Sequence, residues 1–156
     1  MGVYSSRMSP VYLYDSGTEN TSVTGGLTAY DYIPSTSGSA RSKPTISRGT
    51  SAMTISLSGN GGGSGGTVYT SSKVDLTRAK TMNIKVSSIS VQNGGYVRFG
   101  ATATKSTGYT VAAAKTITST GVLSLDVSAL KGSYYLIIAT YGAYDKSVKF
   151  TEWWIE

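Results

Sequence analysis

Residues 52–70 read AMTISLSGNGGGSGGTVYT, and they contain two strand-like segments separated by a run rich in glycine. In the first segment Met53, Ile55 and Leu57 fall on one side of an extended chain, while the residues between them are polar. Alternation with a period of two is typical of an antiparallel strand that has one face on a core and the other in water. The second segment, 67–71, begins directly after the glycines, so the run lies between two predicted strands.

The glycine run itself has three interpretations: a linker between two domains, a loop that binds phosphate, or a loop within one domain. A boundary here would leave a first piece that is too small and too polar to bury a stable core. The run matches G-x-G-x-x-G by letter, but a dinucleotide site requires a helix after the glycines. We therefore predict a loop at 58–66 inside a single domain that spans 1–156, with an N-terminal arm at 1–10.

The same alternation recurs through much of the chain, with turn residues at intervals of about ten, while 134–141 is apolar on both faces as in a central strand. Strands are expected at 11–14, 27–33, 52–58, 67–71, 81–91, 96–104, 111–118, 121–128, 134–141 and 147–156. Asn93-Gly94-Gly95 is expected to form a hairpin turn, with similar turns at 106–108, 119–121 and 141–143, and residues 128–132 are compatible with one helical turn. This pattern predicts an all-β fold, an antiparallel two-sheet β-sandwich of roughly eight to ten strands with jelly-roll-like connections.

The last predicted strand, SVKFTEWWIE at 147–156, cannot keep one alternation along its whole length. A register that turns Val148 and Phe150 inward along the whole strand would bury the carboxylates of Glu152 and Glu156. The opposite register would expose Val148 and Phe150. One extra residue at 151–152, a β-bulge, shifts the phase by one and removes the conflict. The expected inward residues are then Val148, Phe150, Trp153 and Ile155, and the expected outward ones are Lys149, Glu152, Trp154 and Glu156. An outward Trp154 is a candidate subunit contact, because Trp is favoured at interface centres, and the alternative is a ring lying flat on its own sheet.

The composition excludes several classes of function. The chain has no histidine and no cysteine, which removes Ser-His-Asp and Cys-His nucleophiles, disulfides and thiolate metal sites. The net charge of +6 suits either a soluble surface or an acidic partner such as an anionic glycan. The basic residues are spread along the chain without an RNA-recognition motif, so nucleic-acid binding is not expected. No apolar run approaches the length of a membrane span, so membrane insertion is not expected.

The carboxylates form no pair with an evident catalytic role. Asp75 and Asp126 each lie where a strand meets a turn, and aspartate in such places usually accepts hydrogen bonds from nearby backbone N–H groups. The segment DSGTEN, 15–20, is the best candidate for calcium because it clusters oxygen ligands, but a polar turn is the preferred interpretation. We therefore expect no catalytic residue, no metal site and no cofactor.

The 12 tyrosines are the other candidates for function. Tyr30 and Tyr32 are expected on one face of their strand, and Tyr141, Tyr144 and Asp145 cluster in one turn. Aromatic rings beside polar groups suit contact with sugars, since a tyrosine ring is apolar while its hydroxyl is polar. These residues are the candidate glycan contacts, and the alternative is that they are single exposed tyrosines without a function.

Three parts of the chain carry a resemblance to a known kind of module. They are YLYDSGTENTSVTGGL at 12–27, VYTSSKVDLTRAKTMNIKV at 68–86, and TGVLSLDVSALKGSYYLIIATYG at 120–142, which continues to VKFTEWWIE at 148–156. Together they resemble a β-sandwich module of tail and fibre-associated structural proteins from phages and prophages of Gram-positive bacteria. The likeness covers most of the chain but is weak at 32–50. The same pattern of strands also looks like that of carbohydrate-binding modules.

The resemblance implies a non-enzymatic structural protein of a virion, such as a tail, fibre or capsid-decoration subunit. Its implied partners are other copies of itself in a homo-oligomer, other virion proteins and polysaccharide on the host cell surface. Such a subunit is assembled in the host cytoplasm and is extracellular in the mature particle. The alternative function is that of a carbohydrate-binding module for a cell-surface glycan. A stable oligomer in solution favours the first function, and a monomer with saturable glycan binding favours the second.

Overall fold

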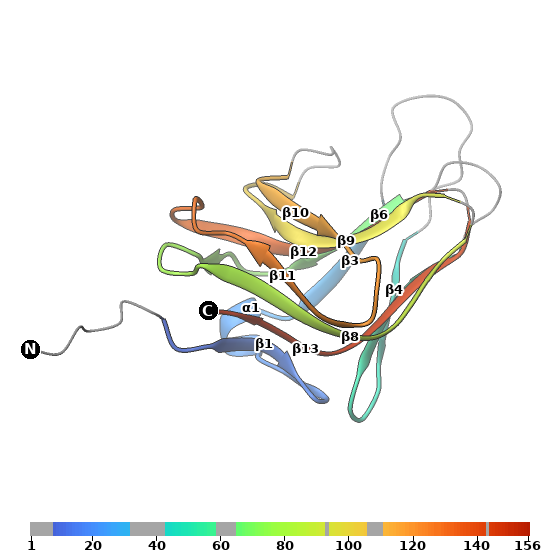
Figure 1. Ribbon diagram of the computed structural model, residues 1–156, viewed down its shortest axis with the longest axis horizontal. Helices are drawn as coiled ribbons and strands as arrows, with labels where there is room; N and C mark the ends of the chain where they lie inside the picture. The colour runs from blue at the N-terminus through green and yellow to red at the C-terminus, as the bar shows by residue number, and fades with distance from the viewer. Residues whose placement is uncertain (1–7, 32–42, 59–64, 93, 106–110, 143) are drawn as a thin grey trace, which may run out of the picture.

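The computed structural model describes residues 8–31, 43–58, 65–92, 94–105, 111–142 and 144–156. Strands of the described residues form two antiparallel sheets that pack against each other. In Figure 1 the strands β9, β10 and β12 belong to the upper layer, and β1, β8 and β13 belong to the lower one. The predicted all-β sandwich is therefore confirmed.

Within the part of the chain that the structure describes, one sheet has seven strands and the other has six. The seven-stranded sheet contains β1 (Val11–Asp15), β2 (Thr18–Glu19), β4 (Thr45–Arg48), β5 (Met53–Leu57), β8 (Thr81–Val91), β11 (Gly121–Asp126) and β13 (Lys146–Ile155). The six-stranded sheet contains β3 (Leu27–Asp31), β6 (Gly65–Thr70), β7 (Val74–Asp75), β9 (Tyr96–Thr102), β10 (Ala113–Thr116) and β12 (Ser133–Tyr141).

Eight of the strands follow the jelly-roll order that the sequence predicts. Neighbouring strands run β5-β13-β8-β11 in the seven-stranded sheet and β6-β12-β9-β10 in the other. Among these eight, only β9 and β10 are consecutive strands within one sheet, and every other connection crosses between the sheets. This alternation between two four-stranded halves is the jelly-roll connection pattern. The remaining five described strands, β1 to β4 and β7, extend the sheets beyond this framework.

The core between the sheets is built from the inward residues of the alternating strands. Its fully buried side chains include Met53, Ile55, Phe99, Leu136 and Trp153. β5 precedes the glycine run and β6 begins inside it, because Gly65 and Gly66 pair with β12 and are strand residues, not part of the loop predicted at 58–66. Both strands contribute to this same cluster. Residues 59–64 of the run lie outside the described residues.

The last strand has the predicted bulge. In the pairing of β13 with β8, Phe150 lies opposite Val86 and Glu152 lies opposite Lys85, so Thr151 is the extra residue. The backbone N–H of Ser16 donates a 2.7 Å hydrogen bond to the Thr151 carbonyl. The four residues predicted to face inward are all buried: Val148, Phe150, Trp153 and Ile155. Trp153 packs its ring edge-on against Phe150, with 6.2 Å between ring centroids.

The predicted hairpin at Asn93-Gly94-Gly95 is wrong. Gly94 and Gly95 do have the expected positive φ values, 90° and 85°. However, β8 and β9, which they join, belong to different sheets, so the turn forms a corner between the layers. The connections at 119–121 and 141–143 also join different sheets. A glycine turn favours a sharp reversal of the chain but does not determine which sheet the next strand joins.

The prediction of a helical turn is also corrected. Residues 128–132 form a turn, in which the Leu130 N–H donates to the Val127 carbonyl, and not a helical segment. A four-residue helix, α1 (Thr21–Thr24), lies instead between β2 and β3, and it ends at Gly25, whose φ is 70°. An asparagine before and a glycine after a short segment are the sequence signals that predict it. Within the described residues, no helix is long and apolar enough to cross a membrane.

Candidate functional site

The outer face of the six-stranded sheet gathers tyrosines from four strands. Along β12, Leu136 and Ile138 point into the core, so Tyr135, Ile137, Ala139 and Tyr141 point outward. The strand register then places the tyrosines of β3, β6 and β9 on this same face. We call the set the tyrosine face: Tyr30 from β3, Tyr69 from β6, Tyr96 from β9, and Tyr135 and Tyr141 from β12.

The rings of the tyrosine face form two groups. At one end Tyr30 packs edge-on against Tyr69, with 5.4 Å between ring centroids. At the other end Tyr96 and Tyr141, which are cross-strand partners, are tilted at 32° with the same centroid separation of 5.4 Å. Aromatic pairs at such distances stabilise each other by about 0.5–1.5 kcal/mol beyond their buried area. The pairs therefore favour the ring positions that the face has.

The centre of the face is apolar and buried. Ile137, Ala139 and Tyr69 form a small hydrophobic cluster that is separate from the main core, and Val111 and Tyr135 pack against it. Burial raises the pKa of the Tyr69 hydroxyl above its ordinary value, although a hydrogen bond with Thr67 opposes the shift. Tyr69 thus supports the rings around it, while the more exposed tyrosines are available for contact.

Three cationic side chains lie on the tyrosine face. The Lys105 Nζ lies 4.7 Å from the centroid of the Tyr135 ring and 5.7 Å from that of Tyr30. The Lys73 Nζ lies 5.5 Å from the centroid of the Tyr135 ring. Arg98, at the other end, places its guanidinium carbon 4.8 Å from the centroid of the Tyr96 ring. Cations over ring faces at these distances are attracted by the negative face of the ring.

The structure brings together only some of the predicted glycan contacts. Tyr30 and Tyr141 both lie on the tyrosine face, from strands far apart in the sequence. Tyr32 lies outside the described residues. Tyr144 and Asp145 lie in the connection between β12 and β13, at the corner of the sheets.

That corner is held by a buried lysine. Lys146 is only 2% exposed, and its Nζ donates a hydrogen bond to the Tyr144 carbonyl. Burial lowers the pKa of Lys146, and the nearby charge of Asp145 opposes the shift. Tyr144 therefore contributes its backbone to the corner, while its ring is exposed.

Sequence reasoning missed three tyrosines of the face and the three cations that lie on it: Tyr69, Tyr96, Tyr135, Lys73, Arg98 and Lys105. The alternation of 96–104 does assign Tyr96 and Arg98 to the side away from the core. Nothing local, however, shows that β6, β12 and β9 are neighbours, because their pairing joins residues as far apart in the sequence as Tyr141 and Gly65.

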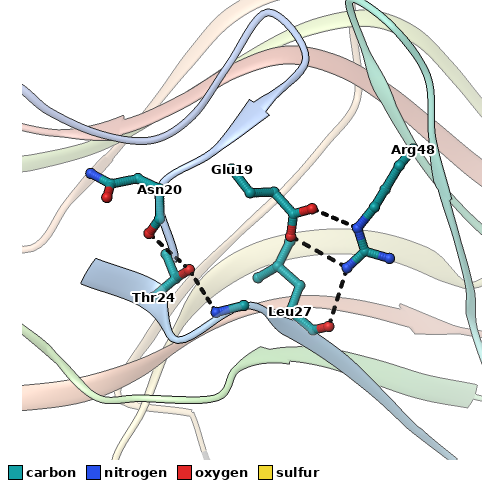
Figure 2. Close-up of polar contacts among 6 residues, drawn as sticks. Glu19, Asn20, Thr24, Leu27 and Arg48 are labelled. Carbon is teal, nitrogen blue, oxygen red and sulfur yellow. Dashed lines mark hydrogen bonds and ion pairs between the residues drawn. The ribbon is translucent and has the colours of Figure 1, made fainter. Parts of the chain in front are cut away.

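The calcium candidate at 15–20 is a polar turn. Asp15 and Thr18 close the β1–β2 hairpin around Ser16 and Gly17, which have φ values of 45° and 98°. Glu19 is held by Arg48, whose Nε donates to the Glu19 Oε2 at 2.5 Å and whose Nη2 donates to the Oε1 at 3.3 Å (Figure 2). This ion pair raises the pKa of Arg48. The described residues contain no cluster of three acidic side chains that could hold a metal ion.

Asp75 and Asp126 have the structural role that the sequence predicts. The Asp75 Oδ1 accepts a 2.9 Å hydrogen bond from the Thr77 N–H, and the Asp126 Oδ1 accepts one of 2.9 Å from the Ser128 N–H. These hydrogen bonds lower the pKa of both carboxyl groups.

The two aspartate turns also bind each other. The Leu76 N–H donates to the Gly132 carbonyl at 2.8 Å, and the Val127 N–H donates to the Lys80 carbonyl at 2.9 Å. The Gly132 N–H in turn donates to the Thr77 hydroxyl at 2.9 Å. The carboxylates therefore order two turns that cross-link the ends of the two sheets.

Trp154 lies on the outer face of the seven-stranded sheet, on the side opposite the tyrosine face. It is half-buried, and its ring stacks on Tyr12 of β1 with 5.7 Å between centroids. The ring thus packs on its own sheet, as in the alternative interpretation, and the stacked pair still presents an aromatic surface. Its role as a subunit contact stays a prediction.

Comparison with protein-family models, with curated proteins and with solved structures finds no match for this chain.

Proposed function

We propose that the chain is a non-catalytic attachment module that binds a polysaccharide through the tyrosine face. The observation that carries the proposal is the convergence of five tyrosines from four strands on one outer sheet face, with cations between them. A face of this kind combines apolar ring surface with hydroxyl and ammonium donors. Sugars offer the complementary combination of apolar C–H surface and many hydroxyl groups.

The energetics also favour tyrosine for this purpose. A tyrosine has only two side-chain torsions, so it contributes a large contact area at a low cost in conformational entropy. The aromatic pairs of this face reduce that cost further, because the rings are already held by one another. A polysaccharide that lies across the face would need little rearrangement of the protein.

The expected setting is the surface of a virion, as a tail, fibre or capsid-decoration subunit. The resemblance of residues 12–27, 68–86 and 120–156 to tail and fibre-associated modules supports this part of the proposal. A symmetric particle carries many copies of each structural subunit, so several weak contacts act together and raise the overall avidity. Modest affinity of a single face is sufficient for such a role.

A subunit that acts by assembly alone is the second candidate function. The stacked pair of Trp154 and Tyr12 favours it, because it places an aromatic surface on the sheet opposite the tyrosine face. Solution mass by light scattering tests this candidate. An oligomeric wild-type chain and a monomeric Trp154→Ala variant with the same fold would support a function in assembly. A monomeric wild-type chain would contradict a function in assembly.

Two tyrosines of the face provide the test of the proposed attachment function. Tyr30 and Tyr141 are 40% and 37% exposed, and Tyr12, on the opposite sheet, is 36% exposed and serves as a matched control. A glycan array identifies a bound polysaccharide, and titration calorimetry then measures its affinity for each variant. We expect Tyr30→Ala and Tyr141→Ala each to weaken binding by about tenfold, which corresponds to one lost ring contact. A loss caused by Tyr12→Ala instead would contradict the proposal.

A further inference from the structure

The positive charges of the tyrosine face have no acidic partner within the described residues. Two ion pairs are present there, Arg48 with Glu19 and Lys85 with Glu152, and both use other cations. Lys73, Lys105 and Arg98 are instead positioned by aromatic rings. A cation held by a ring keeps its full charge, since the ring does not neutralise it.

At one end of the face, two ammonium groups share one ring. The Lys73 and Lys105 Nζ atoms lie 5.5 Å and 4.7 Å from the centroid of Tyr135. The two ammonium groups therefore lie within about 10 Å of each other, and their summed positive charge favours an anionic ligand at this end of the face. Lys105 donates one hydrogen bond, of 3.2 Å, to the Ser71 carbonyl, and an ammonium group has three donors. The Lys105 ammonium group therefore keeps N–H donors that a ligand can use.

At the other end, Arg98 lies beside the Tyr96–Tyr141 pair. Its Nε is buried and has no hydrogen-bond partner among the described residues, so the ring contact with Tyr96 holds the guanidinium in place. A guanidinium carries donors in a planar fork that matches a carboxylate or a phosphate. The two ends of the face thus offer the same charge to a ligand.

The spacing of the two ends indicates a polymer. Tyr135 and Tyr141 lie six residues apart on β12, which corresponds to about 20 Å along the strand. A single small anion can reach only one end of the face. A chain with repeated anionic groups can reach both ends, and the second contact is then formed at a high effective concentration.

We propose that the ligand of the tyrosine face is an acidic polysaccharide, in which carboxylate or phosphate groups bind Lys73, Lys105 and Arg98 while sugar rings contact Tyr30 and Tyr141. This inference rests on the proposed attachment function and adds the chemical class of its ligand. The net charge of +6 assists the encounter with such a polymer at low ionic strength. Single-stranded nucleic acid is the competing anionic polymer, but it binds by stacking successive bases on successive open ring faces. Cations lie over the rings of Tyr30, Tyr96 and Tyr135, so the face has no such series of open rings, whereas a sugar contacts single rings.

Four probes separate the possible ligands of the whole chain. Polygalacturonate supplies carboxylates, and its methyl ester supplies the same backbone without charge. A polysaccharide whose sugar units are joined by phosphodiesters supplies phosphates, and a single-stranded DNA oligonucleotide represents nucleic acid. Affinity electrophoresis or calorimetry measures binding of each probe. We expect one or both acidic non-nucleic polymers to bind, and to bind more weakly as the salt rises from about 50 to about 200 mM.

A pair of double variants tests whether the position of the charges matters. Lys73→Gln with Lys105→Gln removes two charges from the tyrosine face. Lys85→Gln with Lys149→Gln removes two from exposed sites on the opposite sheet, so the net charge of both variants is equal. We expect about a tenfold loss of acidic-polymer affinity in the first variant and less than about a twofold loss in the second.

The outcomes distinguish this inference from the function on which it rests. Equal losses in both double variants, binding of DNA in preference to the acidic polysaccharides, or no binding of either acidic polymer would each overturn the inference. Binding of the neutral ester that depends on Tyr30 and Tyr141 but not on Lys73 and Lys105 would overturn the inference and leave the attachment function intact. Polysaccharide binding that depends on neither set of residues would overturn both.

Discussion

At the scale of single residues, two adjacent tryptophans have opposite roles. Trp153 points into the core and is 0% exposed, whereas Trp154 points outward and stacks on Tyr12. The bulge at Thr151 makes this division possible, because it changes the phase of the strand between Phe150 and Trp153.

The Trp153→Ala variant should therefore be much less stable than Trp154→Ala. Removing the buried ring of Trp153 leaves a large cavity, and we expect the free energy of unfolding to fall by about 3–5 kcal/mol. Trp154→Ala removes a half-buried ring from the surface, so its loss of stability should be clearly smaller. Urea denaturation followed by circular dichroism measures both. Equal losses in the two variants would contradict the bulged register.

Acid should destabilise the fold through Asp75 and Asp126. Their hydrogen bonds to Thr77 and Ser128 lower the pKa of each carboxyl below its ordinary value of 3.8. A carboxyl whose pKa is lower in the folded than in the unfolded chain contributes stability above the unfolded pKa, and this contribution is lost as the pH falls through the folded pKa. The melting temperature of the wild-type chain should thus fall below about pH 4.

The double variant Asp75→Asn with Asp126→Asn tests this origin of the acid sensitivity. Asparagine keeps a side-chain oxygen that can accept the turn hydrogen bond, but it does not titrate. The melting temperature of the variant should be lower than that of wild type at pH 7 and should fall less steeply toward acid. The same acid slope in both chains would show that other groups cause the loss.

At the scale of elements, the β8–β9 and β12–β13 connections pack closely together at Gly95, which leaves no space there for a side chain. A Cβ atom on Gly95 would lie 2.0 Å from the Tyr141 carbonyl oxygen, whereas one on Gly94 would meet nothing within 4 Å. Both residues have positive φ, so both substitutions cost backbone strain. Only Gly95 lies where the β8–β9 and β12–β13 connections touch.

Gly95→Ala should consequently be more harmful than Gly94→Ala. The positive φ alone costs about 1–3 kcal/mol at either position, and the contact with the Tyr141 backbone adds to this cost only at Gly95. Thermal unfolding of the two variants gives the comparison, with Gly94→Ala as the control for strain. If the two melting temperatures were equal, the close packing of the corner would be refuted.

At the scale of the whole molecule, the strands on either side of the glycine run are tied to the same framework. β5 pairs with β13, and β6 pairs with β12, and the two pairs lie in opposite sheets that share one core. We therefore expect a protease site inserted at 59–64 to be cut without separating the chain into two folded pieces. Size-exclusion chromatography after the cut should show one species, and two separately folded fragments would contradict the prediction of a single domain.

Local patterns in the sequence predict much of this fold and less of the site. The local pattern of apolar and polar residues predicts ten of the strands, and the conflict within SVKFTEWWIE predicts the bulge, because both depend on neighbouring residues. The sequence does not reveal that β8 and β9 lie in different sheets, since a glycine turn permits either arrangement. Local spacing finds Tyr30 and Tyr141, because each lies close in the sequence to another tyrosine, but Tyr69 and Tyr135 come beside them only through pairing between distant strands.

The central claim is that the tyrosine face is the surface that binds polysaccharide. The most direct test is nuclear magnetic resonance with labelled tyrosine rings, in which a bound acidic polysaccharide is titrated into the chain. We expect the ring signals of Tyr30, Tyr135 and Tyr141 to shift together and to saturate at one ligand concentration, while the signal of Tyr12 on the opposite sheet stays unchanged. Shifts centred on Tyr12 and Trp154, with the tyrosine face unaffected, would contradict the claim.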